Sequence, residues 1–362
     1  MRSIKQKNKP NNKPDHDHEH KPDNKPEHKN RVLFICKKRN DTYGPSFGLI
    51  NSCKFICNAL EKHGIVCSVE TVIDNNCIDK AVRNFKPDHV FIEALWVVPA
   101  KFEVLLKIYK NIQWYVRVHS KIPFIANEGM AIEWLRGYHE VSEKYSNLHL
   151  SANNVDIVDT FKHVYGIPVS YHPNIYCPPD YGYEPITKFN TKILDVGCFG
   201  AVRPMKNQLI QAMAAMAFGN EIQKKVRFHV NCDRIEQHGD PVMKNLESTF
   251  ANTRHELVKH PWLNHEDFIK TVRKMDIGMQ VSFSETFNIV AADFVWNNVP
   301  VIGSPEISWL SHLYKAEPTD FHQILNRLSM AYYGGKANIQ SVNKSKLDSY
   351  NKEALKVWLS QI

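Results

Sequence analysis

The stretch RVLFICKKRNDTYGPSFGLINSCKFICNALEKHGIVCSV, residues 31–69, decides the fold class of this chain. It starts with a continuous apolar run at residues 32–36, which is typical of a strand buried on both faces. Apolar residues at helical spacing follow over residues 49–63, Gly64 ends that helix, and residues 65–69 form the next strand. A strand, a helix and a strand within about 40 residues make a βαβ unit, which predicts a parallel sheet.

The same alternation continues along the chain in two halves of similar size. In the first half, strands are expected at residues 89–94, 114–119, 149–152 and 169–172, and helices at residues 99–109, 132–144 and 155–165. In the second half, strands are expected at residues 192–196, 226–230, 277–281 and 299–302, and helices at residues 207–217, 241–253, 265–275, 289–296 and 347–359. Two such series predict two doubly wound domains facing each other, with ligands bound in the cleft between them.

Composition shifts divide the chain into five parts. Residues 1–30 have no apolar residue after Ile4, so they are expected to form a disordered low-complexity tail. The histidines of the tail alternate with acids and leave metal binding by the tail open. The remaining parts are a Rossmann-like domain at residues 31–176, a linker at residues 177–190 that starts with the turn formers CPPDYGY, a second Rossmann-like domain at residues 191–345, and a C-terminal helix at residues 346–362.

The overall composition is that of a globular protein, with 43% hydrophobic residues in 362 positions, enough to bury two cores. The eight cysteines are scattered and form no C-x-x-C pair, which predicts reduced thiols in a cytoplasmic protein. No apolar run reaches the ~20 residues that span a bilayer. Of the net charge of +8, the tail supplies about +3, and the remaining charge of about +5 on the folded part is mild; it suits an acidic ligand and leaves nucleic-acid binding open.

A glycine-rich loop with two cations lies in the second half. The segment VGCFGAVRPMKN, residues 196–207, joins a buried strand to a helix, which is where a doubly wound fold places its ligand loop. Gly197 and Gly200 permit close approach of the backbone. Arg203 offers a bidentate fork and Lys206 a point charge, and together they suit a diphosphate. The alternative is a glycine turn with two solvated cations.

A second candidate segment is SFSETFNIVAAD, residues 282–293, which follows the strand at 277–281. Ser284 is the expected helix N-cap, which leaves free backbone amides facing an anion at Phe287, Asn288 and Ile289. Glu285 lies on the loop, and Asp293 lies one to two turns into the helix, where a carboxylate can hold a ribose diol. The alternative is a capping acid and a solvated helix acid.

Together these segments resemble the retaining glycosyltransferases of the GT-B fold, of the GT4-like group. The residues that match the family pattern are, in order, Gly197, Arg203, Lys206, Asp276, Ser282, and Glu285 with Asp293 as its E-x7-E signature. The segment NVPVI at 298–302 is similar to the family's Gly-x-Pro-Val-Val. VRVH at 116–119 is similar to its strand ending in an active-site histidine, and HPNIY at 172–176 to its Pro-Asn-Gly crossover. The resemblance spans residues 31–310 and is strongest over 192–310.

The chain departs from the family pattern at several positions. Asp293 replaces the usual Glu, and Asn207 and Asn288 stand where the family often has Gly. The family's Gly-Gly loop in the first domain is replaced by YGPSFG at residues 43–48.

The resemblance implies a transfer of a sugar from a nucleotide-sugar donor to an acceptor hydroxyl, and because the family is retaining, it implies retention at the transferred carbon. It assigns the acceptor to the first domain and the donor to the second, and it requires neither a metal nor a further cofactor. Arg203 and Lys206 would neutralise the leaving diphosphate, and the amides of residues 287–289 would bind the same phosphates. Glu285 would contact the transferred sugar, Asp293 the ribose, and His119 the sugar from the opposite domain.

Other interpretations remain open on the sequence alone. The acceptor can be a glycan, a lipid or a protein, or a modified base in DNA, which would have to leave the base stack to react. A third interpretation is a nucleotide-sugar-binding protein that has lost catalysis. His119 can equally be a structural histidine at a strand end. His260, Trp262 and His265 lie before the site as candidates to contact the nucleotide base or to pack in the loop.

Overall fold

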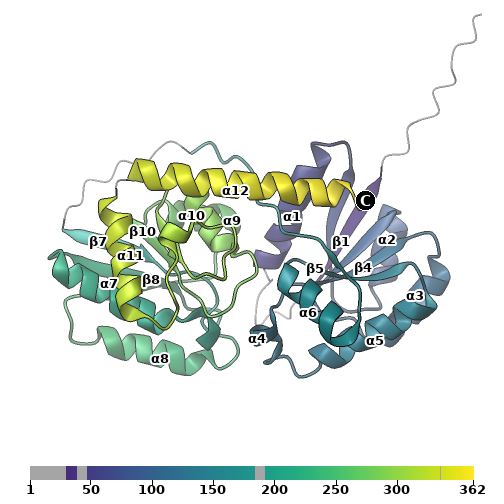
Figure 1. Ribbon diagram of the computed structural model, residues 1–362, viewed down its shortest axis with the longest axis horizontal. Coiled ribbons are helices and arrows are strands. Elements are labelled where there is room, and N and C mark those ends of the chain that lie inside the picture. The colour runs from purple at the N-terminus through teal and green to yellow at the C-terminus, as the bar shows by residue number, and fades with distance from the viewer. Residues whose placement is uncertain (1–29, 39–46, 184–191, 335) are drawn as a thin grey trace, which may run out of the picture.

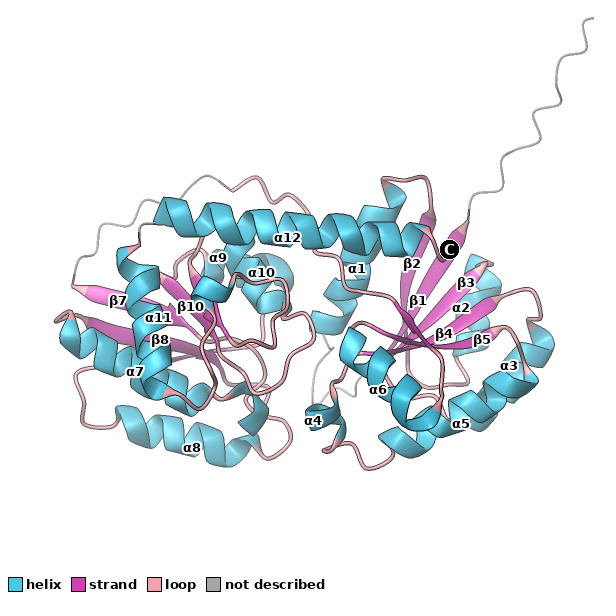
Figure 2. Cartoon of the chain, in the orientation of Figure 1, coloured by secondary structure: helices cyan, strands magenta, loops and turns pink. Residues whose placement is uncertain are grey.

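The structure, a computed structural model, describes residues 30–38, 47–183, 192–334 and 336–362. Its strands form two sheets, and the strand pairs within each sheet are parallel. The first sheet has the strand order β2-β1-β3-β4-β5-β6, and the second has the order β11-β10-β7-β8-β9. Helices lie on both faces of each sheet (Figure 1, Figure 2). Residues 1–29 of the expected tail, residues 184–190 of the expected linker and residues 43–46 of the first-domain loop lie outside the described residues.

The first domain contains the expected alternation of strands and helices. Its elements are β1 (Arg31–Lys37), α1 (Phe47–Glu61), β2 (Val66–Val72), α2 (Ile78–Phe85), β3 (His89–Glu93), α3 (Pro99–Ile108), β4 (Gln113–Val118), α4 (Ile122–Ile125), α5 (Ala131–Lys144), β5 (Leu148–Ala152), α6 (Val155–Tyr165) and β6 (Val169–Tyr171). Helices α2 and α4 were not among the expected elements. Both are short, at 8 and 4 residues, so they offer few turns over which a helical period can be recognised.

The second domain repeats the pattern. Its elements are β7 (Ile193–Gly197), η1 (Pro204–Lys206), α7 (Gln208–Glu221), β8 (Lys225–Asn231), α8 (Gly239–Phe250), β9 (Glu256–His260), α9 (His265–Val272), β10 (Ile277–Gln280), α10 (Ile289–Trp296), β11 (Val301–Gly303), η2 (His312–Tyr314), α11 (Phe321–Tyr333) and α12 (Lys336–Leu359). Strand β9 and helix α11 are additions to the expected elements. The expected left-handed turn after α10 is present, at Asn298 with φ 59°.

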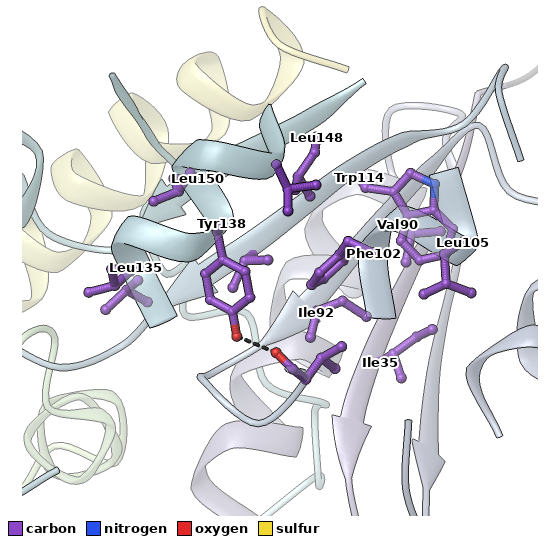
Figure 3. Close-up of a cluster of buried hydrophobic side chains, with 14 of the residues drawn as sticks. Ile35, Val90, Ile92, Phe102, Leu105, Trp114, Leu135, Tyr138, Leu148 and Leu150 are labelled. Carbon is purple, nitrogen blue, oxygen red and sulfur yellow. Dashed lines mark hydrogen bonds between the residues drawn. The ribbon is translucent and has the colours of Figure 1, made fainter. Parts of the chain in front are cut away.

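The core of the first domain consists of large side chains packed between the sheet and the helices α3 and α5 (Figure 3). Trp114 of β4 and Phe102 of α3 are fully buried, and their rings meet edge to face at 6.3 Å. Tyr138 of α5 is buried beside them, and its hydroxyl donates a hydrogen bond to the carbonyl of Val97. Burial of aromatic area on this scale is a main source of the stability of the domain.

Helix α12 connects the two domains by lying along both of them (Figure 1). It starts beside the second domain, where Leu347 is buried in the cluster around α10, and ends against the first sheet. There Trp358 is fully buried, packs against the rings of Phe34 and Phe91, and donates from its indole nitrogen to the carbonyl of Pro173 at 2.8 Å. The helix is longer than the expected 347–359, since it begins at Lys336 and ends at Leu359.

The carboxyl ends of the strands in both sheets face the cleft between the domains. His119 follows β4, Asn153 follows β5 and Ser284 follows β10, and all three line one cavity. Parallel sheets place their ligands at this edge, so the fold brings the expected ligand loops of both domains together. Among the described residues, no helix combines the length and the apolar character needed to cross a membrane.

Candidate active site

The cavity between the domains has a volume of about 290 Å³ and contains most of the residues expected at the site. Both domains contribute to its walls. The expected site residues that line it are His119, Arg203, Lys206, Glu285, Phe287, Asn288 and Ile289. Segments 196–207 and 282–293, far apart in the sequence, therefore converge on one space, as a common ligand would require.

A smaller pocket of about 80 Å³ adjoins this cavity and shares Ile289 and Val290 with it. Two further expected residues, Gly200 and Asp293, line the smaller pocket together with the ring of Trp262. His265, named as a candidate for contact with the base, lines the same pocket.

Gly197 lines neither of these two cavities, although it lies at the end of β7 in the expected ligand loop. A Cβ atom on this residue would lie 2.8 Å from the ring of Phe294 and 2.9 Å from the side chain of Met275. The need for glycine here is therefore explained by packing of the strand against the helix behind it. Gly200 differs, because its φ of 122° lies in a region that other residues rarely adopt.

Lys206 and Glu285 form an ion pair in the wall of the larger cavity. The Lys206 ammonium lies 2.5 Å from Glu285 Oε1, and the two side chains are only 13% and 9% exposed. Backbone and side-chain hydrogen bonds hold the two loops against each other: Phe283 N donates to the Met205 carbonyl at 3.0 Å, and Asn207 Nδ2 donates to the Val281 carbonyl at 3.0 Å. The pair is therefore built into the contact between the loops.

Arg203 lies beside Lys206 and spans the cleft. Its guanidinium stacks over the ring of Phe124, from α4 of the opposite domain, at 4.6 Å from the centroid. On its own domain it reaches Glu236 at 3.4 Å, a long and weak contact. The Nε group of Arg203 is buried and makes no hydrogen bond within the described residues. Arg203 thus retains donor capacity for an anion in the cavity.

The N-terminus of α10 also faces the cavity. Its N-cap is Asn288, with φ 57°, whose Oδ1 accepts from Ala291 N at 2.8 Å; the expectation that Ser284 caps this helix is wrong. Asn tolerates the left-handed conformation that the cap needs here, and the helix itself begins at Ile289, where it was expected. Ile289 and Val290 occupy the first turn, whose amides have no intrahelical acceptor, and both residues line the cavity. Such a helix end favours an anion.

Asp293 is held by an internal network at the edge of the smaller pocket. Its Oδ1 accepts from the Tyr176 hydroxyl at 2.6 Å and lies 2.9 Å from His265 Nε2. His265 in turn contacts the Tyr181 hydroxyl through Nδ1 at 2.7 Å. Burial and the nearby Asp293 carboxylate raise the pKa of Tyr176, so this hydroxyl stays a donor. Asp293 therefore joins α10 to α9 and to the crossover segment between the domains.

On the first-domain wall, His119 stands in front of a buried ion pair. Glu93 and Arg117 are both fully buried, with Arg117 Nη1 3.0 Å from Glu93 Oε2. His119 Nε2 lies 2.5 Å from the same carboxylate oxygen. Burial lowers the pKa of His119, with Glu93 opposing and Arg117 adding to the effect, so the ring is neutral at pH 7. Glu93 and Arg117 were not among the expected site residues.

Direct bonds across the cleft keep the two walls at a defined separation. Asn153 Nδ2 donates to Thr286 Oγ1 at 3.0 Å, immediately beside Glu285. Lys121 pairs with Glu306 of the second domain at 3.1 Å and with Asp156 of its own domain at 2.6 Å. Lys121 and Asn153 were missed in the sequence, although each lies just after a strand, the usual place for ligand contacts in this fold.

Ala94, directly after β3, lies in the left-handed region with φ 69° and lines the cavity. For a residue with a Cβ atom this conformation costs of order 1–3 kcal/mol, and such strain clusters at functional sites. The turn aims the chain so that Glu93 points inward while the next residue meets the cavity.

Solved structures with the same two-domain architecture include sugar-phosphate synthases. The trehalose-6-phosphate synthase OtsA superposes with a TM-score of 0.65 at 12% identity, covering 92% of this chain and 99% of that chain. The sucrose-phosphate synthase of Thermosynechococcus elongatus gives a TM-score of 0.65 at 12% identity, covering 92% of this chain and 98% of that chain. A related E. coli structure bound with UDP-2-fluoro glucose gives 0.62 at 11% identity, covering 92% and 99%.

No family model matches the chain, and no curated protein matches it either. Likeness at 11–12% identity shows the fold alone. The expected GT-B fold, with two Rossmann-like domains facing across a cleft, is confirmed.

Proposed function

We propose that this protein is a glycosyltransferase of the GT4-like group that moves a sugar from a nucleotide-sugar donor to an acceptor hydroxyl, with retention at the transferred carbon. One observation carries the proposal: Arg203, Lys206 and the N-terminus of α10 face the same interdomain cavity as Glu285 and His119. Two cations and a helix dipole aimed at one point make a site for a diphosphate, the leaving group of such a donor.

The donor diphosphate binds where Lys206 now meets Glu285. Phosphate oxygens compete with the carboxylate for the ammonium. The guanidinium of Arg203, whose Nε has no hydrogen-bond partner in the described part of the chain, and the first-turn amides of α10 add donors. These groups stabilise the charge that builds on the diphosphate as the bond to the sugar breaks. Glu285, released from Lys206, is then free to accept hydrogen bonds from the sugar hydroxyls.

The nucleoside extends from the diphosphate into the smaller pocket. Trp262 there provides an aromatic surface for a base, and Asp293, which lines the same pocket, would contact the ribose. The guanidinium of Arg234 lies over the ring of Trp262, 4.9 Å from its centroid. Support for a nucleotide sugar also comes from the similar E. coli structure, which binds UDP-2-fluoro glucose.

The acceptor enters from the first domain, opposite the donor. The wall there presents His119, Lys121 and Asn153. Since two protein cations and backbone amides neutralise the diphosphate, the proposed reaction uses no metal and no further cofactor. Turnover should then persist in the presence of EDTA.

The test starts with a thermal-shift screen of nucleoside diphosphates and sugar nucleotides on the full chain. A ligand that binds only the native state stabilises it by about 2.7 kcal/mol at one hundred times its Kd, which raises the melting temperature. The sugar nucleotide that stabilises most is then assayed for release of its nucleoside diphosphate. Binding without any release would favour the inactive interpretation, and no stabilisation by any nucleotide would overturn the proposal.

A further inference from the structure

The most unusual charge arrangement outside the diphosphate site is the buried pair behind His119. Glu93 and Arg117 lie opposite each other on adjacent strands β3 and β4, in register, in the interior of the first domain. Arg117 is also bonded to the carbonyl of His172 at 2.9 Å and to Asn174 Oδ1 at 2.6 Å. A pair of this kind seldom increases stability over apolar residues of similar size, because both ions lose their hydration. The pair therefore points to a role other than stability.

The carboxylate of Glu93 has more acceptor capacity than Arg117 uses. Its Oε2 atom accepts from Arg117 and from His119, and its Oε1 atom has no hydrogen-bond partner within the described residues. Burial by itself would raise the pKa of Glu93, but the adjacent Arg117 and His119 hold it below the usual value. Glu93 is therefore ionised at pH 7, and an ionised carboxylate only accepts hydrogen bonds. The neutral His119 ring must then carry its proton on Nε2.

The other ring nitrogen of His119 is thereby left as an acceptor. Its protein neighbour is Asn153 Nδ2 at 3.3 Å, a long contact. The same amide nitrogen has two other acceptors, Asn174 Oδ1 at 3.3 Å and Thr286 Oγ1 at 3.0 Å. An amide has two hydrogens, so three acceptors cannot all be satisfied at once. Nδ1 of His119 is consequently open to a hydroxyl donor in the cavity.

We propose that Glu93 is a positioning residue for the transfer reaction, one that locks His119 with Nε2–H donated inward and Nδ1 presented as a hydrogen-bond acceptor to a substrate hydroxyl. Glu93 itself does not line the cavity, so it acts through His119. The ordered, strained turn at Ala94 supports this role, since it fixes the carboxylate at the end of β3. This inference rests on the proposed function, because it assigns a role within that reaction.

The first test needs no variant at the pair. Imidazole nitrogen-15 spectra of the full wild-type chain are recorded from pH 5 to 8, with the His119 signals assigned by their loss in His119→Gln. We expect a neutral ring over pH 6.5 to 8, with the proton on Nε2 and an unprotonated Nδ1. A proton on Nδ1, or a ring that is charged at pH 7, would overturn the proposal.

The second test compares the pH dependence of kcat/KM in Glu93→Gln and in the wild type. The amide can donate as well as accept, so it no longer selects one tautomer, and we expect kcat/KM to fall by about ten- to a hundredfold. Glu93 raises the pKa of His119 and Arg117 lowers it, so neutralising Glu93 lowers that pKa further. The acidic limb of the profile should therefore move to lower pH. A uniform loss of rate with an unmoved limb would indicate a purely structural role and would overturn the proposal.

Two companion variants control for folding. Glu93→Gln leaves Arg117 buried without its counter-ion, so the double variant Glu93→Gln/Arg117→Met removes both charges and avoids an uncompensated ion. It should fold, as judged by circular dichroism, and still lose about tenfold or more in kcat/KM. Folded protein with wild-type kcat/KM would contradict the proposal. Glu103→Gln, at an exposed pair with Lys144, is the matched control and should leave kcat/KM unchanged.

Failure of the inference and failure of the proposed function give different results. If the wild-type chain releases no nucleoside diphosphate from any sugar nucleotide, the proposed function fails, and the nitrogen-15 spectra still report the His119 tautomer. If turnover is found and Glu93→Gln matches the wild type in rate and profile, only the inference fails.

Discussion

The ammonium of Lys206 lies 2.5 Å from Glu285 Oε1, although 79 positions separate the two residues in the chain. This pair connects the loop after β7 with the loop after β10, the two segments that the sequence singles out. In the free protein the two groups pair with each other, and both side chains are mostly buried. An anionic ligand must therefore displace the Glu285 carboxylate from the Lys206 ammonium. The strength of this ion pair thus sets both the affinity for the donor and the freedom of Glu285 to contact the sugar.

Removing either partner should affect nucleotide binding in opposite directions. Lys206→Ala should weaken binding of the nucleoside diphosphate by about 1.5–3 kcal/mol, because a charge-assisted hydrogen bond is lost. Glu285→Gln should bind it more tightly, since the competing carboxylate is gone, yet should lose turnover. Isothermal titration calorimetry measures the affinities. Lys270→Ala, at an exposed lysine on α9, is the matched control. Weaker binding by Glu285→Gln would contradict this account of the pair.

Arg203→Lys should show that the planar fork matters and not only the charge. Lysine cannot bind two phosphate oxygens in parallel, and it would stack less well on Phe124. We expect KM for the donor to rise by about tenfold, equivalent to about 1.4 kcal/mol, with the melting temperature of the free protein little changed. Steady-state kinetics against donor concentration measure this effect. An unchanged KM would mean that Arg203 does not contact the donor. Arg83→Lys, at an exposed pair on α2, provides the control.

The glycine in β10 is required by packing against α10. A Cβ atom at Gly278 would lie 2.5 Å from the ring of Phe294, a side chain that is itself fully buried. Gly278→Ala should therefore lower the free energy of unfolding by about 1–3 kcal/mol through overpacking. Urea denaturation measures the change. Gly129→Ala, where a Cβ meets no atom within 4 Å and φ is not positive, should be close to neutral. Equal stability of the two variants would contradict the packing argument.

The buried His172 should make the protein sensitive to acid. Burial, with help from Arg117, lowers its pKa to about 3 from the usual 6.5. Above pH 6.5 the ring is neutral in both the folded and the unfolded chain, so it has no effect on the pH dependence. As the pH falls from 6.5 towards 3, only the unfolded chain binds this proton, and stability is lost at up to about 1.4 kcal/mol per pH unit.

His172→Gln isolates this contribution, because it removes one titrating group and leaves the others. Urea unfolding of both proteins at several pH values between 7 and 4 should show a shallower decline in the variant. Parallel declines would mean that His172 titrates normally in the folded protein.

Much of the fold could be predicted because the chain alternates strand and helix patterns with clear boundaries. The buried run of β1 and the helical spacing of α1 are examples, and both are found. Strand β9, ELVKH, could not be recognised, since it lies at the edge of its sheet and none of its residues is fully buried. The path of α12 was also out of reach: a helical pattern indicates an apolar face but not which domain that face covers.

The donor side of the site could be predicted because glycines, cations and carboxylates follow strands there in a recognisable order. The groups behind His119 could not, because a single charge within an apolar strand does not reveal its partner. A signal did exist, since Glu93 and Arg117 are opposite charges within two consecutive apolar runs. Their pairing becomes apparent only from the register that places them side by side.

The position of Trp358 has a consequence for how this protein is made. The aromatic centre of the first sheet, around Phe34 and Phe91, is covered by Trp358, a side chain encoded more than 260 residues after either of them. During synthesis, at about 5–20 residues per second, the first domain emerges long before that tryptophan does. For some tens of seconds, the face of its sheet around Phe34 and Phe91 therefore lacks the tryptophan that covers it. We therefore expect the nascent first half to be a client of chaperones, and the two halves to gain their full rigidity together in one late step.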